Sequence, residues 1–195
     1  MAGEKYIVAA PENASQIAVR NILNPNGFTY LGNCGDAVSL MRLTRSFHPD
    51  FIVVDMGMQH SDVRNTIQTI DDEMLCATVL LGDYSDTGIF SLIEKANAIS
   101  FCPKPVNRDV FLHTVELANI NYKRVFGLDK KLKEMTENYE SRKQVERAKW
   151  ILMERDGLSE NEAYERIRKK SMDNRMSMRS IAEAIIYTYE IMGKG

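Results

Sequence analysis

Hydrophobic and polar positions divide this chain into two kinds of sequence. Up to about residue 125, short apolar runs alternate with stretches in which apolar residues recur at helical spacing. After that point only the helical spacing remains. The strand-like runs are 5–10, 28–33, 51–56, 77–82 and 98–102, and the helical stretches are 13–23, 36–47, 62–70, 86–96 and 107–125.

This alternation predicts an α/β fold for the first part of the chain. Five strands that alternate with five helices are typical of a doubly wound, flavodoxin-like parallel sheet. The run FIVVDM at 51–56 is apolar almost throughout, as expected of a central strand that helices cover on both faces. Asn13 and Gln16 have the spacing of a capping box at the first helix. In such sheets, ligands bind at the carboxyl ends of the strands.

Residues 123–140 predict a helix that carries an apolar stripe. The stripe residues, spaced by four, three and four, are Leu128, Leu132, Met135 and Tyr139. That spacing is typical of a short coiled-coil seam. The stripe fits either a homodimer or docking on the α/β domain, and we favour the homodimer.

The remaining residues predict a small bundle of three helices. The first ends at Asp156-Gly157, Ser159 and Glu162 form a capping box for the second, and a break near 173–177 precedes the third. Because each apolar face is narrow, the helices must share one core. The predicted core residues are Val145, Ala148, Leu152, Ala163, Ile167, Ile181 and Ile185. The predicted domains are therefore an α/β domain at 1–122, a helical linker at 123–140 and an all-α domain at 141–195.

Charge is distributed unevenly between these parts. Residues 1–122 carry 8 lysines and arginines against 14 aspartates and glutamates, a net charge of −6, whereas residues 123–195 carry 17 against 13, a net charge of +4. The second part therefore tolerates a polyanion such as a nucleic acid. Mixed charges on solvated helices give the same pattern, so charge alone does not decide between the two interpretations.

Other features exclude several classes of protein. No run approaches the ~18 apolar residues of a membrane span, and the chain begins without a signal-peptide pattern. The three cysteines are scattered, and no histidine or cysteine spacing indicates a metal site. Phosphate-binding loops, dinucleotide fingerprints and nucleophile elbows are absent. We expect a cytoplasmic protein that has no membrane contact, no metal ligands and no enzymatic activity. No cofactor is indicated with certainty.

Two charged residues fall at the carboxyl ends of predicted strands. Asp55 ends the third strand, and Lys104 follows the fifth in CPKP. A carboxylate that meets an ammonium there is the minimum for an acyl-phosphate site. With the order of elements and the runs VVDMGM and PKP, residues 4–122 resemble the receiver domain of response regulators. The resemblance implies that Asp55 is the phospho-acceptor, Lys104 the conserved lysine and Phe101 the aromatic switch residue.

The sequence departs from that family where a divalent cation would bind. Receivers carry an acidic pair after the first strand, whereas this chain has Ala10 and Pro11, with only Glu12 nearby. Mg²⁺ requires oxygen ligands, which the side chains of Ala and Pro lack. We therefore expect weakened Mg²⁺ binding, although Glu12 or Asp83 would still supply a carboxylate.

A second departure concerns the phosphoryl group. Gly82 stands where receivers have Ser or Thr, whose hydroxyl binds that group. We therefore favour a degenerate receiver, in which the Asp55–Lys104 pair is structural, over one that is phosphorylated in the ordinary way. Its control would come from a partner, either a sensor kinase or another regulatory protein, or from an unusual trigger.

The segment 140–186 carries a second resemblance, to the ANTAR domain, the RNA-binding output module of bacterial transcription antiterminators. Trp150 departs from that pattern, since the family usually has a small residue there. The matching residues are Arg142, Val145, Glu146, Ala148, Lys149, Ile151, Leu152, Met153, Gly157, Ser159, Glu162, Ala163, Ile167, Arg168, Ser171, Met172, Asp173, Arg175, Ile181 and Ala182.

This second resemblance implies that the chain binds paired hairpins in a leader transcript, which keeps a terminator stem from forming. Cationic side chains would contact phosphates and loop bases, and a flat side chain would stack on splayed bases. Trp150 fits such stacking, or packing in the core or in a dimer. A DNA-binding response regulator and a protein-interaction signalling module are the alternative functions. The predicted RNA-binding residues are Arg142, Lys149, Arg168, Lys170, Arg175 and Arg179.

Overall fold

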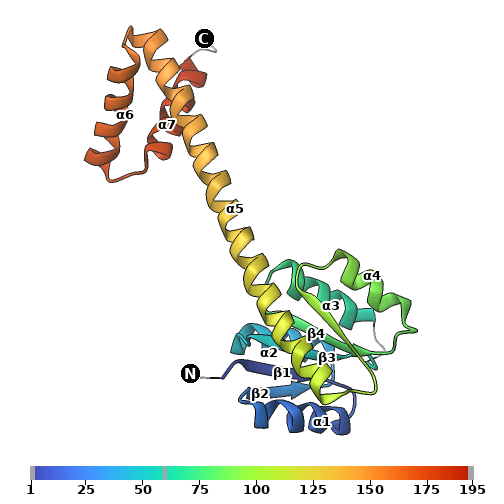
Figure 1. Cartoon of the computed structure of the whole chain (residues 1–195). Helices are drawn as coiled ribbons and strands as arrows, with labels where there is room; N and C mark the ends of the chain where they lie inside the picture. Colours follow the sequence, from blue (N-terminus) through green and yellow to red (C-terminus); the bar gives the residue numbers. More distant parts are fainter. Residues whose placement is uncertain (1–2, 59–60, 193–195) are drawn as a thin grey trace. The chain divides into compact units, whose positions relative to one another are not determined.

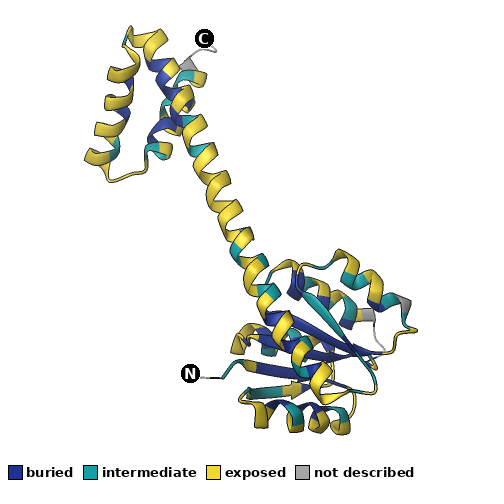
Figure 2. Ribbon diagram, in the orientation of Figure 1, coloured by how far each residue is buried: buried dark blue, intermediate teal, exposed yellow. Residues whose placement is uncertain are grey.

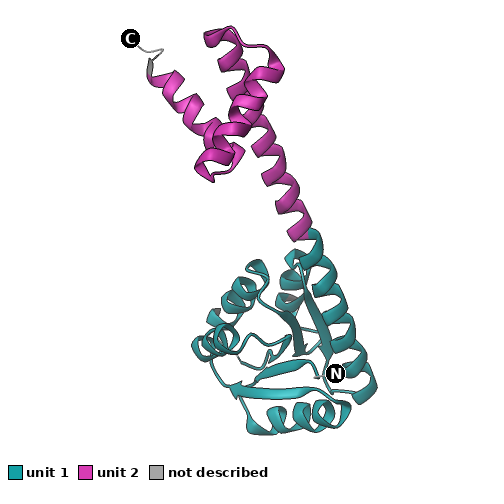
Figure 3. Cartoon of the chain, turned by 90° about the vertical axis from the view of Figure 1, so that its left-hand side faces the viewer, with its two compact units in different colours: residues 1–128 teal, residues 129–195 magenta. Residues whose placement is uncertain are grey.

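A computed structural model describes residues 3–58 and 61–192 of the chain. The chain separates into two compact units, Met1–Leu128 and Asp129–Gly195 (Figure 3). The last three residues of the predicted 141–195 domain lie outside the described residues.

The first unit contains a five-stranded parallel sheet with helices between the strands (Figure 1). The strand order is β2-β1-β3-β4-β5, and all four neighbouring pairs are parallel. This arrangement confirms the predicted doubly wound sheet. The strands are β1 Lys5–Ala9, β2 Thr29–Cys34, β3 Phe51–Asp55, β4 Ala77–Gly82 and β5 Ile99–Pro103. The helices are α1 Asn13–Leu23, α2 Ala37–Phe47, α3 Ser61–Asp72, α4 Thr87–Lys95 and the start of α5 Arg108–Asp156, with a short 3₁₀ turn η1 at Asn24–Asn26.

Two apolar layers hold the sheet between its helices. Val19 of α1 and Phe111 of α5 pack on one face, whereas Leu40 of α2 and Ile67 of α3 pack on the other. Every residue of β3 is buried, as the continuous apolar run predicts, and Figure 2 shows the central strands in the colour of buried residues, whereas β2 and β5 at the edges are largely intermediate. The sheet therefore fixes the end of β3, where Asp55 lies.

The start of α1 differs from the prediction. Glu12 is its N-cap residue, and no side chain caps the helix there. Gln16 is buried, its Nε2 donates to the carbonyl oxygen of Ala10 at 3.1 Å, and its Oε1 accepts a hydrogen bond from Asn33. The predicted capping box of Asn13 and Gln16 is therefore wrong, because the Gln16 amide satisfies polar groups at the ends of β1 and β2.

The second unit is entirely helical in its described residues. It contains the later part of α5, then α6 Glu160–Asn174 and α7 Met178–Met192. The capping box of α6 is confirmed, since the backbone nitrogen of Ser159 donates to the Glu162 carboxylate at 2.9 Å and the Ser159 hydroxyl accepts from the Glu162 backbone. Gly157 ends α5 with a φ of 67°, where a glycine carries no steric penalty.

One core joins the three helices of this unit. Six of the seven predicted core residues are buried, and Ile185 is only partly buried because Ile186 takes the deeper position. The buried residues are Val145, Ala148, Ile151, Leu152, Ala163, Ile167, Ile181, Ala182 and Ile186. Over residues 3–58 and 61–192, no helix combines the length and apolar character needed to cross a membrane.

Candidate functional site

The carboxyl end of β3 holds a closed ion pair. Asp55 is only 2 % exposed, and the Lys104 Nζ lies 2.6 Å from its Oδ1 and 2.7 Å from its Oδ2. The backbone nitrogen of Gly57 also donates to Oδ1 at 2.9 Å. The structure therefore brings Asp55 and Lys104 together as the sequence predicts, with both carboxylate oxygens engaged.

Gly82, at the end of β4, is closely packed against an aliphatic side chain. A Cβ atom at this position would lie 2.5 Å from the Cδ1 of Ile89, which is itself fully buried. A Ser or Thr side chain would therefore displace Ile89. The hydroxyl that receivers use for the phosphoryl group is thus absent, and an aliphatic side chain occupies its place.

The groups near Asp55 do not fit a magnesium ion. Ala10 is buried and its carbonyl oxygen accepts from Gln16, whereas Pro11 and Glu12 are exposed. Asp83 is exposed in the loop after β4. Among the described residues no cluster of three His, Cys, Asp or Glu side chains could hold a metal ion. Mg²⁺ would need several oxygen ligands, and the Asp55 carboxylate is already bound by Lys104.

Phe101 belongs to a surface cluster of three aromatic rings. Its ring centroid lies 5.3 Å from that of Tyr84, in an edge contact, and 6.0 Å from that of Phe90. Tyr84 and Phe90 are exposed and stack on each other. The sequence pattern indicates Phe101 alone, because Tyr84 and Phe90 reach it only through the fold of the β4–α4 segment. The switch role of Phe101 stays a prediction.

Lys149 is held inside the helical unit. Its side chain is 8 % exposed, and its Nζ lies 2.9 Å from Glu146 and 2.7 Å from Glu160. Hydrogen bonds to Glu160 and then to Glu146 raise the pKa of Lys149, and the bond from Lys149 lowers the pKa of Glu160. This geometry links α5 to α6 and favours a structural role for Lys149 over the RNA contact expected from the sequence.

The other predicted RNA-binding residues are exposed. Arg168 pairs with Glu165 at 3.2 Å, and Arg179 pairs with Glu183 at 2.7 Å. Such surface pairs contribute only about 0–1 kcal/mol, so these arginines can exchange their partner for a phosphate. The remaining three predicted RNA-binding residues, Arg142, Lys170 and Arg175, have no ion-pair partner among the described residues.

Trp150, the residue that departs from the family pattern, is 56 % exposed. Packing in the core of the helical unit is therefore excluded for this side chain. A dimer contact and stacking on RNA both stay open as interpretations.

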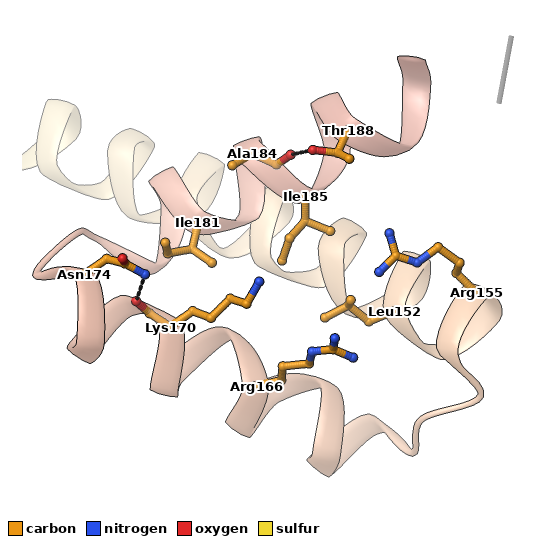
Figure 4. A pocket seen from close by; sticks show the side chains of 9 residues that line it. All are labelled: Leu152, Arg155, Arg166, Lys170, Asn174, Ile181, Ala184, Ile185 and Thr188. Atoms are coloured by element: carbon orange, nitrogen blue, oxygen red, sulfur yellow. Dashed lines mark hydrogen bonds between the residues drawn. The ribbon is translucent and has the colours of Figure 1, made fainter. Parts of the chain in front are cut away.

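A pocket of about 240 Å³ lies between the end of α5, α6 and α7. We call it the cationic pocket, because Arg155, Arg166 and Lys170 point toward the same space (Figure 4). Neither Arg155 nor Arg166 is among the RNA-binding residues predicted from the sequence. The spacing of Arg166 and Lys170 by four residues on one helix was a usable signal, but the approach of Arg155 from α5 follows only from the packing. The other lining residues are Leu152, Asn174, Ile181, Ala184, Ile185 and Thr188.

Comparisons with known proteins agree with the division of the chain into two units. The family model of the ANTAR domain matches residues 133–186. The transcriptional regulatory protein PdtaR of Mycobacterium tuberculosis is 25% identical over 184 residues, which cover 94% of this chain and 90% of that protein. 

Among solved structures, the signal receiver domain of a modulated diguanylate cyclase from Desulfovibrio desulfuricans G20 has a TM-score of 0.55, with 18% identity over 62% of this chain and 97% of that one. The receiver domain of the response regulator NarL from Mycobacterium tuberculosis has a TM-score of 0.53, with 15% identity over 60% and 98%. These likenesses show that the first unit has the receiver fold.

Proposed function

The chain joins a receiver-fold domain to an ANTAR domain, and on this premise we propose that it is an RNA-binding transcription antiterminator of the response-regulator type. It acts in the cytoplasm and binds hairpins in leader transcripts. The observation that carries the proposal is the ANTAR match at 133–186, which falls entirely within the helical unit. The exposed cations of that unit supply the phosphate contacts that RNA binding requires.

A gel-shift experiment with the full chain tests this proposal. The probes are a leader RNA with two hairpins, the same RNA with both loop sequences scrambled, and duplex DNA of equal length, each at several salt concentrations. We expect tight, salt-dependent binding of the first RNA, because bound phosphates release counterions, and weaker binding of the other probes. Preference for duplex DNA would support a DNA-binding regulator, and equally weak binding of all probes would support a protein-interaction module.

The receiver-fold domain regulates this output without ordinary phosphorylation. The closed Asp55–Lys104 pair, the aliphatic filling beside Gly82 and the lack of further carboxylates at Ala10 and Pro11 support this part of the proposal. A regulatory protein or a sensor kinase supplies the signal by binding. Incubation with a small phosphodonor and Mg²⁺ tests it, because stoichiometric labelling that is lost in Asp55→Asn would contradict the proposal.

The exposed stripe on α5 supports a homodimer. Its side chains are between 60% and 71% exposed, and their spacing is that of a coiled-coil seam. A second copy of the same helix offers the same seam, so we assign the homodimer to this stripe. The stripe residues are Leu128, Leu132, Met135 and Tyr139.

Analytical ultracentrifugation tests the homodimer. Leu132→Lys places a charge in the seam and should produce monomers, whereas the control Glu137→Lys, which lies off the stripe, should leave dimers. A monomeric wild-type chain would contradict the homodimer and leave the RNA-binding proposal standing.

A further inference from the structure

Positive charge in the cationic pocket exceeds what the protein itself neutralises. Arg155 and Arg166 share a single carboxylate, because Asp156 Oδ1 lies 2.7 Å from Arg155 Nε and Asp156 Oδ2 lies 2.6 Å from Arg166 Nη1. The described residues give Lys170 no ion-pair partner, and none of the lining residues is acidic. An anionic group is therefore the ligand that the pocket favours.

The walls of the pocket carry a second chemical signal. Leu152, Ile181 and Ile185 present aliphatic side chains between the cationic groups (Figure 4). A bare inorganic anion gains nothing from such a surface, whereas a nucleobase can lie against apolar side chains while its phosphate meets the cations. At the rim, the Asn174 Nδ2 donates to the carbonyl oxygen of Lys170 at 2.9 Å, which leaves the Asn174 amide oxygen as an acceptor.

The size of the pocket limits what it can hold. Its volume of about 240 Å³ is below the roughly 300–1,000 Å³ typical of pockets that enclose a whole small molecule. One nucleotide of a longer strand matches this space better than a complete cofactor does. Bases in a hairpin loop are already unpaired, so their extrusion costs less than that of a base in a stem.

From these observations we infer that the cationic pocket receives one unstacked nucleotide from a hairpin loop of the bound RNA. The phosphate meets Arg155, Arg166 and Lys170, and the base lies against Leu152 and Ile185. The inference rests on the proposed function, and it assigns sequence recognition in the loop to this pocket.

Matched variants of the intact protein separate the pocket from general electrostatics. Lys170→Gln removes a pocket cation, and Lys169→Gln removes the same charge from the neighbouring exposed position, which does not line the pocket. Ala184→Met fills the pocket without changing the charge, at an exposed helical position that tolerates Met. We expect Lys170→Gln to weaken binding of the two-hairpin RNA about tenfold, as loss of one charge-assisted contact does, and Lys169→Gln to weaken it less than about threefold. Ala184→Met should also weaken binding about tenfold, because its side chain occupies the space of the nucleotide. Thermal melting checks that all three variants fold.

Fluorescence reports on the nucleotide itself. 2-Aminopurine is placed at each loop position of the RNA in turn, and we expect one position to change its emission on binding to the wild-type protein but not to Ala184→Met. A response that is the same in both proteins at every position would overturn the inference. Equal weakening of RNA binding by Lys169→Gln and Lys170→Gln would also overturn the inference. In both cases the protein still binds RNA, so the proposed function would stand.

Two further outcomes are decisive. Failure of the wild-type protein to bind any hairpin RNA would overturn both the inference and the proposed function. Displacement of the RNA by free nucleoside monophosphates at concentrations similar to that of the RNA would assign the pocket to a soluble nucleotide. That result would overturn the assignment of the pocket to a loop nucleotide and leave RNA binding by other surfaces intact.

Discussion

The ion pair at the end of β3 and the cationic pocket use lysine side chains in opposite ways. The Lys104 ammonium lies within 2.7 Å of both oxygens of a buried carboxylate. Lys170 lines a pocket whose described residues include no carboxylate at all. The charge of Lys104 is satisfied inside the protein, whereas the charge of Lys170 remains available to a ligand.

This difference shows that the partner of a cation, and not its place in a family pattern, indicates its role. Lys149 belongs to the ANTAR pattern, yet its contacts with Glu146 and Glu160 resemble those of Lys104 more than those of Lys170. Burial decides the energetics of each case. A buried charge that loses its partner is costly, whereas an exposed charge that loses its partner is solvated by water.

Removing the ammonium from the buried pair should have the largest effect. Lys104→Met leaves the Asp55 carboxylate buried without its counter-charge, and we expect the free energy of unfolding to fall by about 3 kcal/mol. The double variant Asp55→Asn/Lys104→Met removes both charges and should recover most of that loss. Urea unfolding measures both values, and a Lys104→Met protein as stable as the wild type would show that the pair is not structural.

Restoring a hydroxyl beside the pair should have a smaller effect. Gly82→Ser places an atom 2.5 Å from the Ile89 Cδ1, and we expect a loss of ~1–2 kcal/mol from overpacking. Ile89→Val removes that Cδ1 and costs about 1 kcal/mol by itself. The double variant has no such clash, so its loss of unfolding free energy should be much smaller than the sum of the two single losses. Strict additivity in urea unfolding would contradict the close contact.

Most of the fold follows from local pattern, as β3 illustrates. Its continuous apolar run predicts a strand covered on both faces, and every residue of β3 is buried. The failures arise where a distant group competes with a local one. Gln16 has the spacing of a capping residue, but its amide meets Ala10 and Asn33 instead. Ile186 is buried whereas Ile185 is only partly buried, and these adjacent apolar residues cannot be told apart by spacing alone.

The candidate site follows from the sequence only in part. Strand order brings Asp55 to Lys104, and any parallel sheet with these strand ends would do so. Arg155 lies 11 residues before Arg166, on a different helix, and the two meet because both pair with Asp156, the last residue of α5 before the turn at Gly157. That convergence depends on how the helices pack. Apolar periodicity predicts which helix faces form the core, but it does not predict the direction in which each polar side chain points.

The smallest effect on RNA binding should come from Lys149, although it matches the family pattern. Because its side chain is buried and paired, we expect Lys149→Gln to change the affinity for the two-hairpin RNA less than about twofold, whereas loss of the pocket cation Lys170 should cost about tenfold. Its stability loss should be smaller than that of Lys104→Met, because Glu146 and Glu160 are exposed and stay hydrated without it. A tenfold loss of RNA affinity with unchanged melting would instead make Lys149 an RNA contact.

The pH dependence of that variant sharpens the comparison further. Because the pKa of Glu160 is lowered in the folded protein, its ionised form stabilises the fold above the ordinary glutamate pKa. This stabilisation is lost as the pH falls through the lowered pKa. Because the pKa of Lys149 is raised in the folded protein, its protonated form stabilises the fold below the ordinary lysine pKa. This stabilisation is lost as the pH rises through the raised pKa. The difference in melting temperature between the wild type and Lys149→Gln should therefore be constant between about pH 5 and pH 10, and it should shrink below about pH 4. A difference that already disappears near neutral pH would show that the contacts of Lys149 do not stabilise the helical unit, since neither partner changes its charge there.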